Sequence, residues 1–148
     1  MYIVNREFSI DWGDCDPAGI VFYPRYFCMF DVSTAFIFNS ALKISKYELL
    51  NKFNIIGFPM VDNGARFHYP SRFGDIVNIE TKIDRFGRSS FDVSHKLWRD
   101  GVLAIEAYEK RVWAARDEEN PEKIRGVPIP EIVIDALSIK NKDVRNEV

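Results

Sequence analysis

The spacing of apolar and polar residues changes along the chain, and the change predicts a strand followed by a buried helix. Residues 2–12 alternate loosely and stop at Gly13, which is typical of a strand. Residues 24–40 are apolar on nearly every side of a helical wheel, and they open with Pro24, a preferred first residue of a helix. A helix with this composition is buried, so we expect a sheet to wrap around it.

The rest of the pattern predicts a second, shorter helix and then an antiparallel meander. Residues 44–53 are amphipathic with the period of a surface helix. Four strands follow it, at residues 58–69, 76–83, 90–98 and 102–116. The pair Asp100-Gly101 is a strong hairpin signal between the last two strands. We therefore expect an α+β fold in which a sheet of about five strands wraps around one long helix.

The length of the chain fits one domain. A chain of 148 residues is large enough to bury a core of its own, so we expect residues 1–148 to form a single domain. Beyond residue 118 the chain turns polar, apart from a short apolar segment at residues 132–137. The charged tail, from about residue 138, is expected to be frayed.

Charge and composition narrow the possible partners. A net charge of −2 and a pI of about 5.7 give no long-range attraction for nucleic acid. The sequence has neither a signal peptide nor an apolar run long enough for a membrane span, so we expect no membrane partner and a cytoplasmic protein. Cys15 and Cys28 have no metal-ligand spacing, which favours two reduced thiols and no metal site.

The segment Gly13–Gly19, GDCDPAG, predicts a rigid loop that presents a polar side chain. Two glycines and a proline in seven residues fix unusual backbone angles, and loops held in this way often carry function. Asp14 and Asp16 are rival carboxylates, and Asp16 before a proline also suits a simple Asx turn. Cys15 could act as a nucleophile only if His68 or His95 reached it from a predicted strand.

The stretch GDCDPAGIVFYPRY, residues 13–26, closely resembles the signature of the 4-hydroxybenzoyl-CoA thioesterase family. That signature has an Asp, a Gly three residues later, and a Tyr-Pro pair that opens the central helix. The resemblance is looser over residues 2–116 as a whole. It implies a hot-dog fold, thioester hydrolysis and recognition of coenzyme A.

The resemblance also implies catalytic roles for Asp16 and Tyr23. Asp16 would be the nucleophile or the general base, with Asp14 left to a capping or solvated role. The backbone N–H of Tyr23 would bind the developing oxyanion at the positive end of the helix. Many acyl-CoA thioesterases of the superfamily have His at that position, and Tyr shifts the expectation toward a hydroxybenzoyl type of substrate. Tyr23 could otherwise be a packing residue.

Further residues are implied in binding. Asp31 lies inside the apolar helix and needs a partner, which the resemblance makes a phenolic hydroxyl in the acyl pocket of a neighbouring subunit. An Arg or a backbone N–H across a dimer interface is an equally good partner. The turn that contains Arg88, Ser89 and Ser90 would hold the phosphates of coenzyme A, or it is simply a charged turn. Phe22, Phe58 and Pro59 could line the acyl pocket, although such phenylalanines are usually core residues.

The resulting hypothesis is a hydrolase for an aromatic acyl-CoA such as 4-hydroxybenzoyl-CoA, which needs no cofactor because coenzyme A is part of the substrate. The alternatives are a thioesterase for short aliphatic acyl-CoA and a non-catalytic hot-dog module that binds an acyl group. An Asp–His pair of the dehydratase type has no evident counterpart. Exposed strand edges in a single chain favour a homodimer or a homotetramer.

Overall fold

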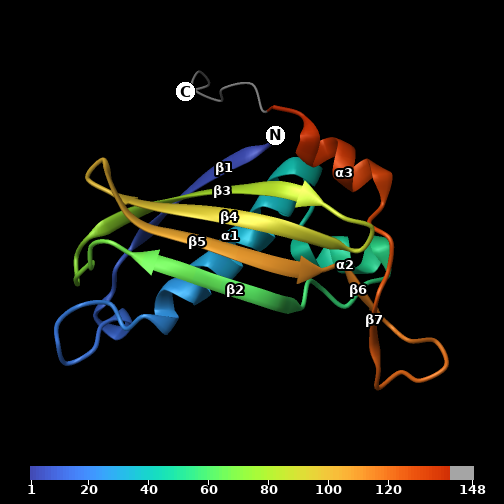
Figure 1. Cartoon of the computed structure of the whole chain (residues 1–148), viewed down its shortest axis with the longest axis horizontal. Helices are drawn as coiled ribbons and strands as arrows, with labels where there is room; N and C mark the ends of the chain where they lie inside the picture. Colours follow the sequence, from blue (N-terminus) through green and yellow to red (C-terminus); the bar gives the residue numbers. More distant parts are fainter. Residues whose placement is uncertain (141–148) are drawn as a thin grey trace.

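A five-stranded antiparallel sheet wraps one side of a long helix in the computed structural model, which describes residues 1–140 (Figure 1). The helix is α1, Pro24–Leu42. The strands of the sheet are β1 (Ile3–Ser9), β2 (Met60–Phe67), β3 (Ile76–Phe86), β4 (Ser90–Arg99) and β5 (Val102–Val112). Their order is β1-β3-β4-β5-β2. The predicted α+β class and the strand number of the main sheet are confirmed.

Helix α1 begins where the sequence predicts and ends two residues later than expected. Pro24 occupies its first turn, and Lys43 ends it in the left-handed conformation with φ 59°. One side of the helix, which includes Phe30 and Phe38, is fully buried against the sheet. Cys28 and Asp31 lie on the exposed side. The sheet therefore covers only part of a helix that the sequence predicted to be buried all round.

The predicted meander is correct for β3, β4 and β5 and wrong for β2. Strand β2 pairs with β5, with Gly64 opposite Tyr108, and so forms an edge of the sheet. It cannot form a hairpin with β3, because β1 and β4 occupy both sides of β3. Alternating apolar residues report which face of a strand is buried, and they do not report which strand lies beside it.

The smaller elements depart from the sequence prediction in one place. Helix α2, Lys46–Phe53, is capped by a reciprocal pair of hydrogen bonds between Ser45 and Glu48. The strand expected at residues 102–116 breaks after β5, and its end forms β6 (Ala114–Arg116), which pairs with β7 (Ile124–Gly126). This two-stranded ribbon was not predicted from the residue pattern. The break lies at Trp113, whose buried side chain belongs to the core.

Helix α3, Glu131–Ser138, contains the predicted apolar segment at residues 132–137. The predicted frayed tail lies mostly in residues 141–148, outside the described residues. Among residues 1–140 no single helix is long and apolar enough to span a membrane. Helices α1 and α2 pass that test of length and composition only as a pair, with a bend of 71° between them.

Two core clusters lie along α1, where the helix meets the sheet, and the first also includes residues of α2 and α3. One surrounds Phe38 and Trp113 toward the C-terminal end of α1. The other surrounds Tyr26, Phe30 and Ile105 toward the N-terminal end. The helix is thus anchored along its length, and its N-terminus is held in a fixed position beside the Gly13–Gly19 loop.

Candidate active site

The loop that carries Asp16 is a miniature hairpin held by its own backbone. Cys15 and Val21 form an isolated antiparallel bridge, and the Asp16 N–H donates to the Ile20 carbonyl at 3.0 Å. The Gly19 N–H donates to the Asp16 carbonyl at 2.9 Å, and Gly19 has a φ of 79°, which favours glycine. The position of Asp16 is therefore set by the fold and not by a flexible loop.

The Asp16 carboxylate is held by one oxygen and free at the other. Its Oδ1 accepts the Ala18 N–H at 2.8 Å, which is the Asx turn that the sequence offered as the simple alternative. Within residues 1–140, no hydrogen bond engages its Oδ2. The side chain is half-buried. The turn orients the carboxylate while leaving an oxygen available, so the structural role and a catalytic role are compatible.

A free backbone donor lies at the start of α1. The Phe22 N–H donates to the Asp14 carbonyl at 2.8 Å, and Pro24 has no N–H. The Tyr23 N–H lies between them and donates to no group in the described part of the chain. Tyr23 is the N-cap residue of α1 and already has helical angles, φ −53° and ψ −34°. Its N–H therefore belongs to the positive end of the helix and is available for an anionic oxygen.

An apolar pocket of about 330 Å³ lies beside Tyr23. Ring contacts tie its walls together, since the Tyr26 and Phe67 rings are 5.9 Å apart. Phe22 packs edge-on to Tyr23 at 5.8 Å and is 48% exposed. A pocket of this size lined by rings suits a planar apolar group. Its lining residues are Ile20, Val21, Tyr23, Tyr26, Phe67, His68, Tyr69 and Pro70.

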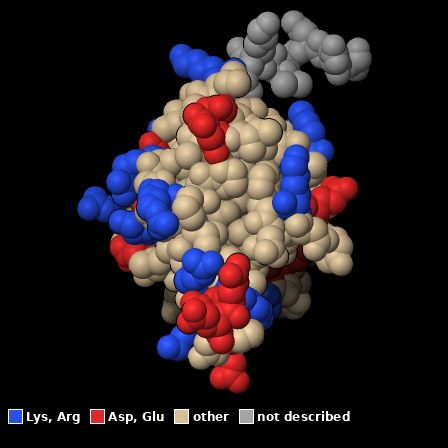
Figure 2. Space-filling view, turned by 90° about the vertical axis from the view of Figure 1, so that its right-hand side faces the viewer, with Lys and Arg blue, Asp and Glu red and all other residues tan. Residues whose placement is uncertain are grey.

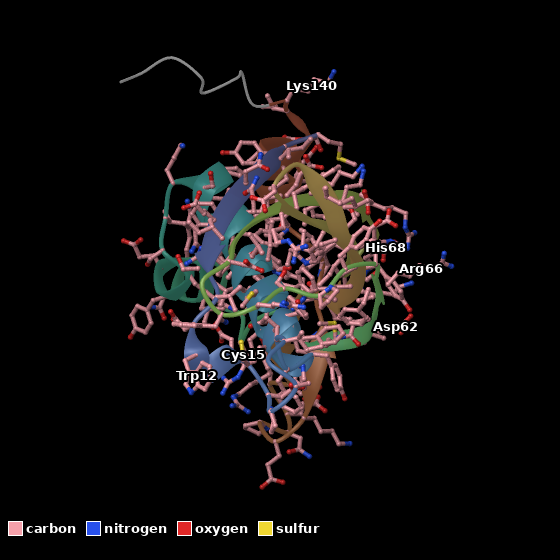
Figure 3. The ribbon with its side chains drawn as sticks, turned by 90° about the vertical axis from the view of Figure 1, so that its left-hand side faces the viewer. Trp12, Cys15, Asp62, Arg66, His68 and Lys140 are labelled. Carbon is pink, nitrogen blue, oxygen red and sulfur yellow. The ribbon has the colours of Figure 1, made fainter. Side chains whose placement is uncertain are left out.

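The rival groups in the loop have other contacts. Asp14 Oδ2 accepts the Asp11 N–H at 2.9 Å, so Asp14 caps the short 3-10 helix Trp12–Asp14, as predicted. Cys15 contacts the Asp11 carbonyl and neither histidine. Figure 3 shows Cys15 near Trp12 and His68 apart from it, near Arg66. His95 is buried in the sheet, so no Cys–His pair forms. The described residues also contain no group of three metal-ligating side chains.

Asp31 finds its partner within the same chain. Its Oδ1 accepts the Arg111 Nη2–H at 2.7 Å, while its side chain remains 57% exposed. Arg111 also donates from Nη1 to the Phe58 carbonyl at 3.1 Å. The partner is an arginine, as one alternative held, but it comes from the sheet of the same subunit and not across an interface. Asp31 is thereby presented on the exposed side of α1.

Behind Asp31 lies a buried polar network that the sequence analysis missed. Glu109 Oε2 accepts hydrogen bonds from Arg111 Nε and from the Thr34 hydroxyl, both at 2.7 Å. His95 Nε2 lies 3.3 Å from Glu109 Oε1, and its Nδ1 is 2.8 Å from the Thr81 hydroxyl. A signal was present, because Glu109 and Arg111 share the alternation of the buried Ala107 and so point toward the helix.

A sequence profile of the Thioesterase superfamily matches residues 18–105. The chain is also 32% identical over 140 residues to the 4-hydroxybenzoyl-CoA thioesterase of Pseudomonas sp. (strain CBS-3), covering 91% of this chain and 97% of that one. The chain belongs to the thioesterase superfamily.

Solved structures agree with this assignment. A mutant of 4-hydroxybenzoyl-CoA thioesterase in complex with 4-hydroxybenzoyl-CoA matches with a TM-score of 0.84 and 30% identity, over 92% of this chain and 99% of that one. A gentisyl-coenzyme A thioesterase matches with a TM-score of 0.78 and 32% identity, over 91% and 100%. The chain is thus a thioester hydrolase with the hot-dog fold that the resemblance implied.

Two expected pocket residues of this thioesterase lie elsewhere in the single chain. Phe58 is only 5% exposed and packs on Phe38 and Trp113, with ring centroids 4.7 and 5.3 Å away. That cluster lies toward the other end of α1, so Phe58 does not reach the pocket beside Tyr23. Pro59 adjoins it, and its carbonyl accepts the Val112 N–H at 3.1 Å. Both residues behave as core and strand-pairing residues within one chain.

The turn with Arg88, Ser89 and Ser90 also lies far from Asp16 within one chain. It follows β3, whose 11 residues span roughly 35 Å from the end near the Asp16 loop. Figure 1 shows this turn and the N-terminus of α1 at opposite ends of the sheet. Figure 2 views the end of the thioesterase near the turn, where Lys and Arg side chains flank an uncharged centre.

The buried network of this thioesterase makes its stability depend on pH. Burial alone raises the pKa of Glu109, but hydrogen bonds and charges of His95 and Arg111 outweigh it and lower the pKa from 4.5 to about 2. Burial alone would lower the pKa of Arg111. The hydrogen bonds and charges of Glu109 and then of Asp31 outweigh burial and raise the pKa above its usual value. A carboxylate with a lowered pKa stabilises the fold above its unfolded pKa, and this stability is lost as the pH falls.

We therefore expect the Glu109 contribution, on the order of 3 kcal/mol, to disappear between about pH 5 and pH 2. The measurement is urea unfolding of the wild type and of Glu109→Gln at several pH values from 6 to 3. The difference in unfolding free energy should shrink steadily on acidification. A difference that stays constant over this range would contradict the assigned ionisation of Glu109.

Proposed function

We propose that the chain hydrolyses an aromatic acyl-CoA, 4-hydroxybenzoyl-CoA or a close hydroxylated relative, to the free acid and coenzyme A. The observation that carries this proposal is the ring-lined pocket beside the free Tyr23 N–H and the Asp16 loop. Relatives that act on 4-hydroxybenzoyl-CoA and on gentisyl-coenzyme A support a hydroxylated aromatic substrate.

In the proposed mechanism the Asp16 carboxylate acts directly on the thioester. As a nucleophile, its free oxygen attacks the carbonyl carbon, the thiolate of coenzyme A leaves, and water then opens the resulting anhydride. As a general base, Asp16 takes a proton from a water that attacks the same carbon, and the thiolate again leaves. The free Oδ2 serves either route. The Asx turn on Oδ1 supports both, because it fixes the direction in which the carboxylate points.

The oxyanion that forms on the thioester carbonyl needs a donor that costs no reorganisation. The Tyr23 N–H is proposed for this role, since it is unpaired in residues 1–140 and lies at the positive end of a 19-residue helix. Phe22 and the Tyr23 ring would flank the aryl group. A contact between Asp31 and the ring hydroxyl would come from a neighbouring subunit, where the Arg111 pair would orient the carboxylate.

The coenzyme A end of the substrate is proposed to contact Arg88, Ser89 and Ser90. Phe58 and Pro59 would contact the substrate only at its periphery. Because this turn is far from Asp16 in one chain, the contact requires the turn of another subunit. We therefore propose a homodimer or a homotetramer as the functional unit. The carboxylate mechanism needs no cofactor, and a cytoplasmic location fits an acyl-CoA substrate.

Steady-state release of free thiol from 4-hydroxybenzoyl-CoA, benzoyl-CoA and butyryl-CoA tests the proposed substrate. We expect the hydroxylated ring to be preferred over benzoyl by tenfold or more in kcat/KM, about 1.4 kcal/mol, because a polar contact at the far end of the ring is lost without the hydroxyl. Butyryl-CoA should be poorer still. Equal or better turnover of butyryl-CoA would contradict the aromatic substrate and favour a short aliphatic acyl-CoA. No turnover of any of the three thioesters would favour a non-catalytic binding module.

A further inference from the structure

The two proposed catalytic groups lie on separate elements that meet at Phe22. Asp16 lies on the hairpin that the Cys15–Val21 bridge closes, and the Tyr23 N–H belongs to the start of α1. The Phe22 N–H donates to the hairpin, and the Phe22 carbonyl accepts a hydrogen bond in the first turn of the helix. Rotation about the two soft backbone dihedrals of this one residue would move the carboxylate relative to the oxyanion donor. Their relative position therefore depends on a second contact between the hairpin and the helix.

A second contact runs through the hydroxyl of Tyr26. The Tyr26 Oη accepts the Ser71 N–H at 3.1 Å, and the Ser71 carbonyl accepts the Val21 N–H at 2.9 Å. Tyr26 lies in the first turn of α1, where its N–H donates to the Tyr23 carbonyl at 3.0 Å. Val21 is the residue that closes the hairpin. These two hydrogen bonds of Ser71, the Ser71 link, therefore join the helix to the hairpin without passing through Phe22.

The Ser71 link is shielded from water along its length. Tyr26, Ser71 and Val21 are exposed by only 3%, 0% and 4%. A buried hydrogen bond has no water to replace a lost partner, so the remaining group stays unsatisfied. The Ser71 Oγ is also buried and has no hydrogen-bond partner in the described part of the chain. Ser71 thus contributes its backbone, and the hydroxyl of Tyr26 is the side-chain group on which the link depends.

The surrounding segments converge on this point. Figure 1 shows the end of β2, the start of α1 and the loop before α1 at the same end of the sheet. The Tyr26 ring lines the apolar pocket and lies 5.9 Å from the Phe67 ring, measured between centroids. The ring of Tyr26 therefore forms part of the pocket wall, while its hydroxyl contacts the backbone behind that wall.

We propose that Tyr26 is a positioning residue for hydrolysis, whose hydroxyl holds the Asp16 hairpin in place relative to the Tyr23 N–H through the backbone of Ser71. This role rests on the proposed functions of Asp16 and of the Tyr23 N–H. The hydroxyl acts on the orientation of the carboxylate and not on the thioester itself.

The expected effect follows from the geometry of the reaction. The free Oδ2 of Asp16 has to reach the thioester carbon, or the water that attacks it, while the carbonyl oxygen lies at the Tyr23 N–H. A misplacement of about 1 Å in such an arrangement can lower the rate by about 10²-fold. Loss of the Ser71 link should therefore lower kcat, whereas substrate binding should change little because the pocket wall remains.

Tyr26→Phe tests this role, because it removes the hydroxyl and keeps the ring. We expect kcat for 4-hydroxybenzoyl-CoA to fall by about tenfold to a hundredfold, while KM changes by less than about threefold. Benzoyl-CoA should show the same fall, since the link acts at the thioester end and not at the ring substituent. Steady-state thiol release gives both constants for each substrate.

Tyr2→Phe is the matched control. The Tyr2 hydroxyl forms a hydrogen bond of 2.8 Å with the Ser40 hydroxyl, toward the other end of α1. Both variants lose a tyrosine hydroxyl that contacts another segment, so both should unfold at a lower urea concentration than the wild type. Only Tyr26→Phe should lower kcat. Equal losses of kcat in the two variants would show a general effect of destabilisation and would overturn the positioning role.

A double variant tests whether Tyr26 acts through Asp16. In the Asp16→Asn background, the added Tyr26→Phe change should lower kcat by less than about threefold, because the group that the link positions is already lost. A further loss as large as in the wild-type background would overturn the positioning role. Wild-type kcat in Tyr26→Phe would overturn it too, and either result leaves the chemistry of Asp16 standing. A wild type that releases no thiol would overturn the proposed function itself.

Discussion

Replacing Asp16 by Asn should lower kcat for the acyl-CoA substrate by about 10³-fold, within the range of 10²–10⁴ associated with loss of a positioned acid–base group. Asparagine keeps an oxygen that can accept the Ala18 N–H, so the Asx turn is expected to persist. What is lost is the charge and nucleophilicity of the free oxygen. Thiol release gives kcat, and substrate binding by the variant, measured by calorimetry, should stay close to that of the wild type.

Asp14→Asn is the matched control for this loss. Asp14 lies two residues away, and its carboxylate caps a short 3-10 helix. Its substitution should change kcat by less than about threefold, since an amide oxygen can still accept the capping hydrogen bond. If Asp14→Asn abolished turnover while Asp16→Asn left it unchanged, the catalytic carboxylate would be assigned to the wrong residue.

Arg111→Met should lower the free energy of unfolding by about 3–5 kcal/mol, because it leaves the buried Glu109 carboxylate without the guanidinium that lies 2.7 Å from its Oε2. The guanidinium is 6% exposed and joins Glu109, Asp31 and the Phe58 carbonyl, so three groups lose a donor together. Urea unfolding monitored by tryptophan fluorescence gives the difference. Catalysis should weaken as well, because Asp31 is no longer held in position.

Two variants make this result specific to the buried network. Arg85→Met removes the arginine of the exposed Arg85–Asp92 pair, and its effect should stay below about 1 kcal/mol. Replacing Glu109 and Arg111 together by methionine should be less damaging than Arg111→Met alone, since the double variant leaves no buried carboxylate without its guanidinium partner. A single Arg111 variant as stable as the wild type would show that the network adds nothing to the fold.

The local structure of this chain was predictable because its signals are local. The apolar periodicity, Pro24 and the Asp100-Gly101 turn were enough to predict α1 and the hairpin of β4 with β5. The high content of Gly, Asp and Pro in residues 13–19 likewise indicated a rigid turn, which the structure contains. In these regions the residues that determine the conformation are neighbours in the sequence.

The pairing of distant segments was not predictable in the same way. Strand β2 pairs with β5 some forty residues later, and its alternation is compatible with either neighbour. The partner of Asp31 lies 80 residues away on β5. A lone acidic residue in an apolar helix therefore predicted that a polar partner was required, but it did not identify Arg111. The pairing of β6 with β7 was not predicted, because a strand of three residues is too short to show an alternation of apolar and polar positions.

Thiol release from 4-hydroxybenzoyl-CoA by the purified wild-type chain, beside Asp16→Asn in the same assay, tests the central claim most directly. The proposed site predicts a kcat/KM of about 10⁴ M⁻¹s⁻¹ or more for the wild type, in the ordinary range of enzymes, and its near-complete loss in the variant. Efficient hydrolysis that survives in Asp16→Asn would contradict the role of this carboxylate. A wild type that binds the substrate and releases no thiol would contradict the enzyme itself.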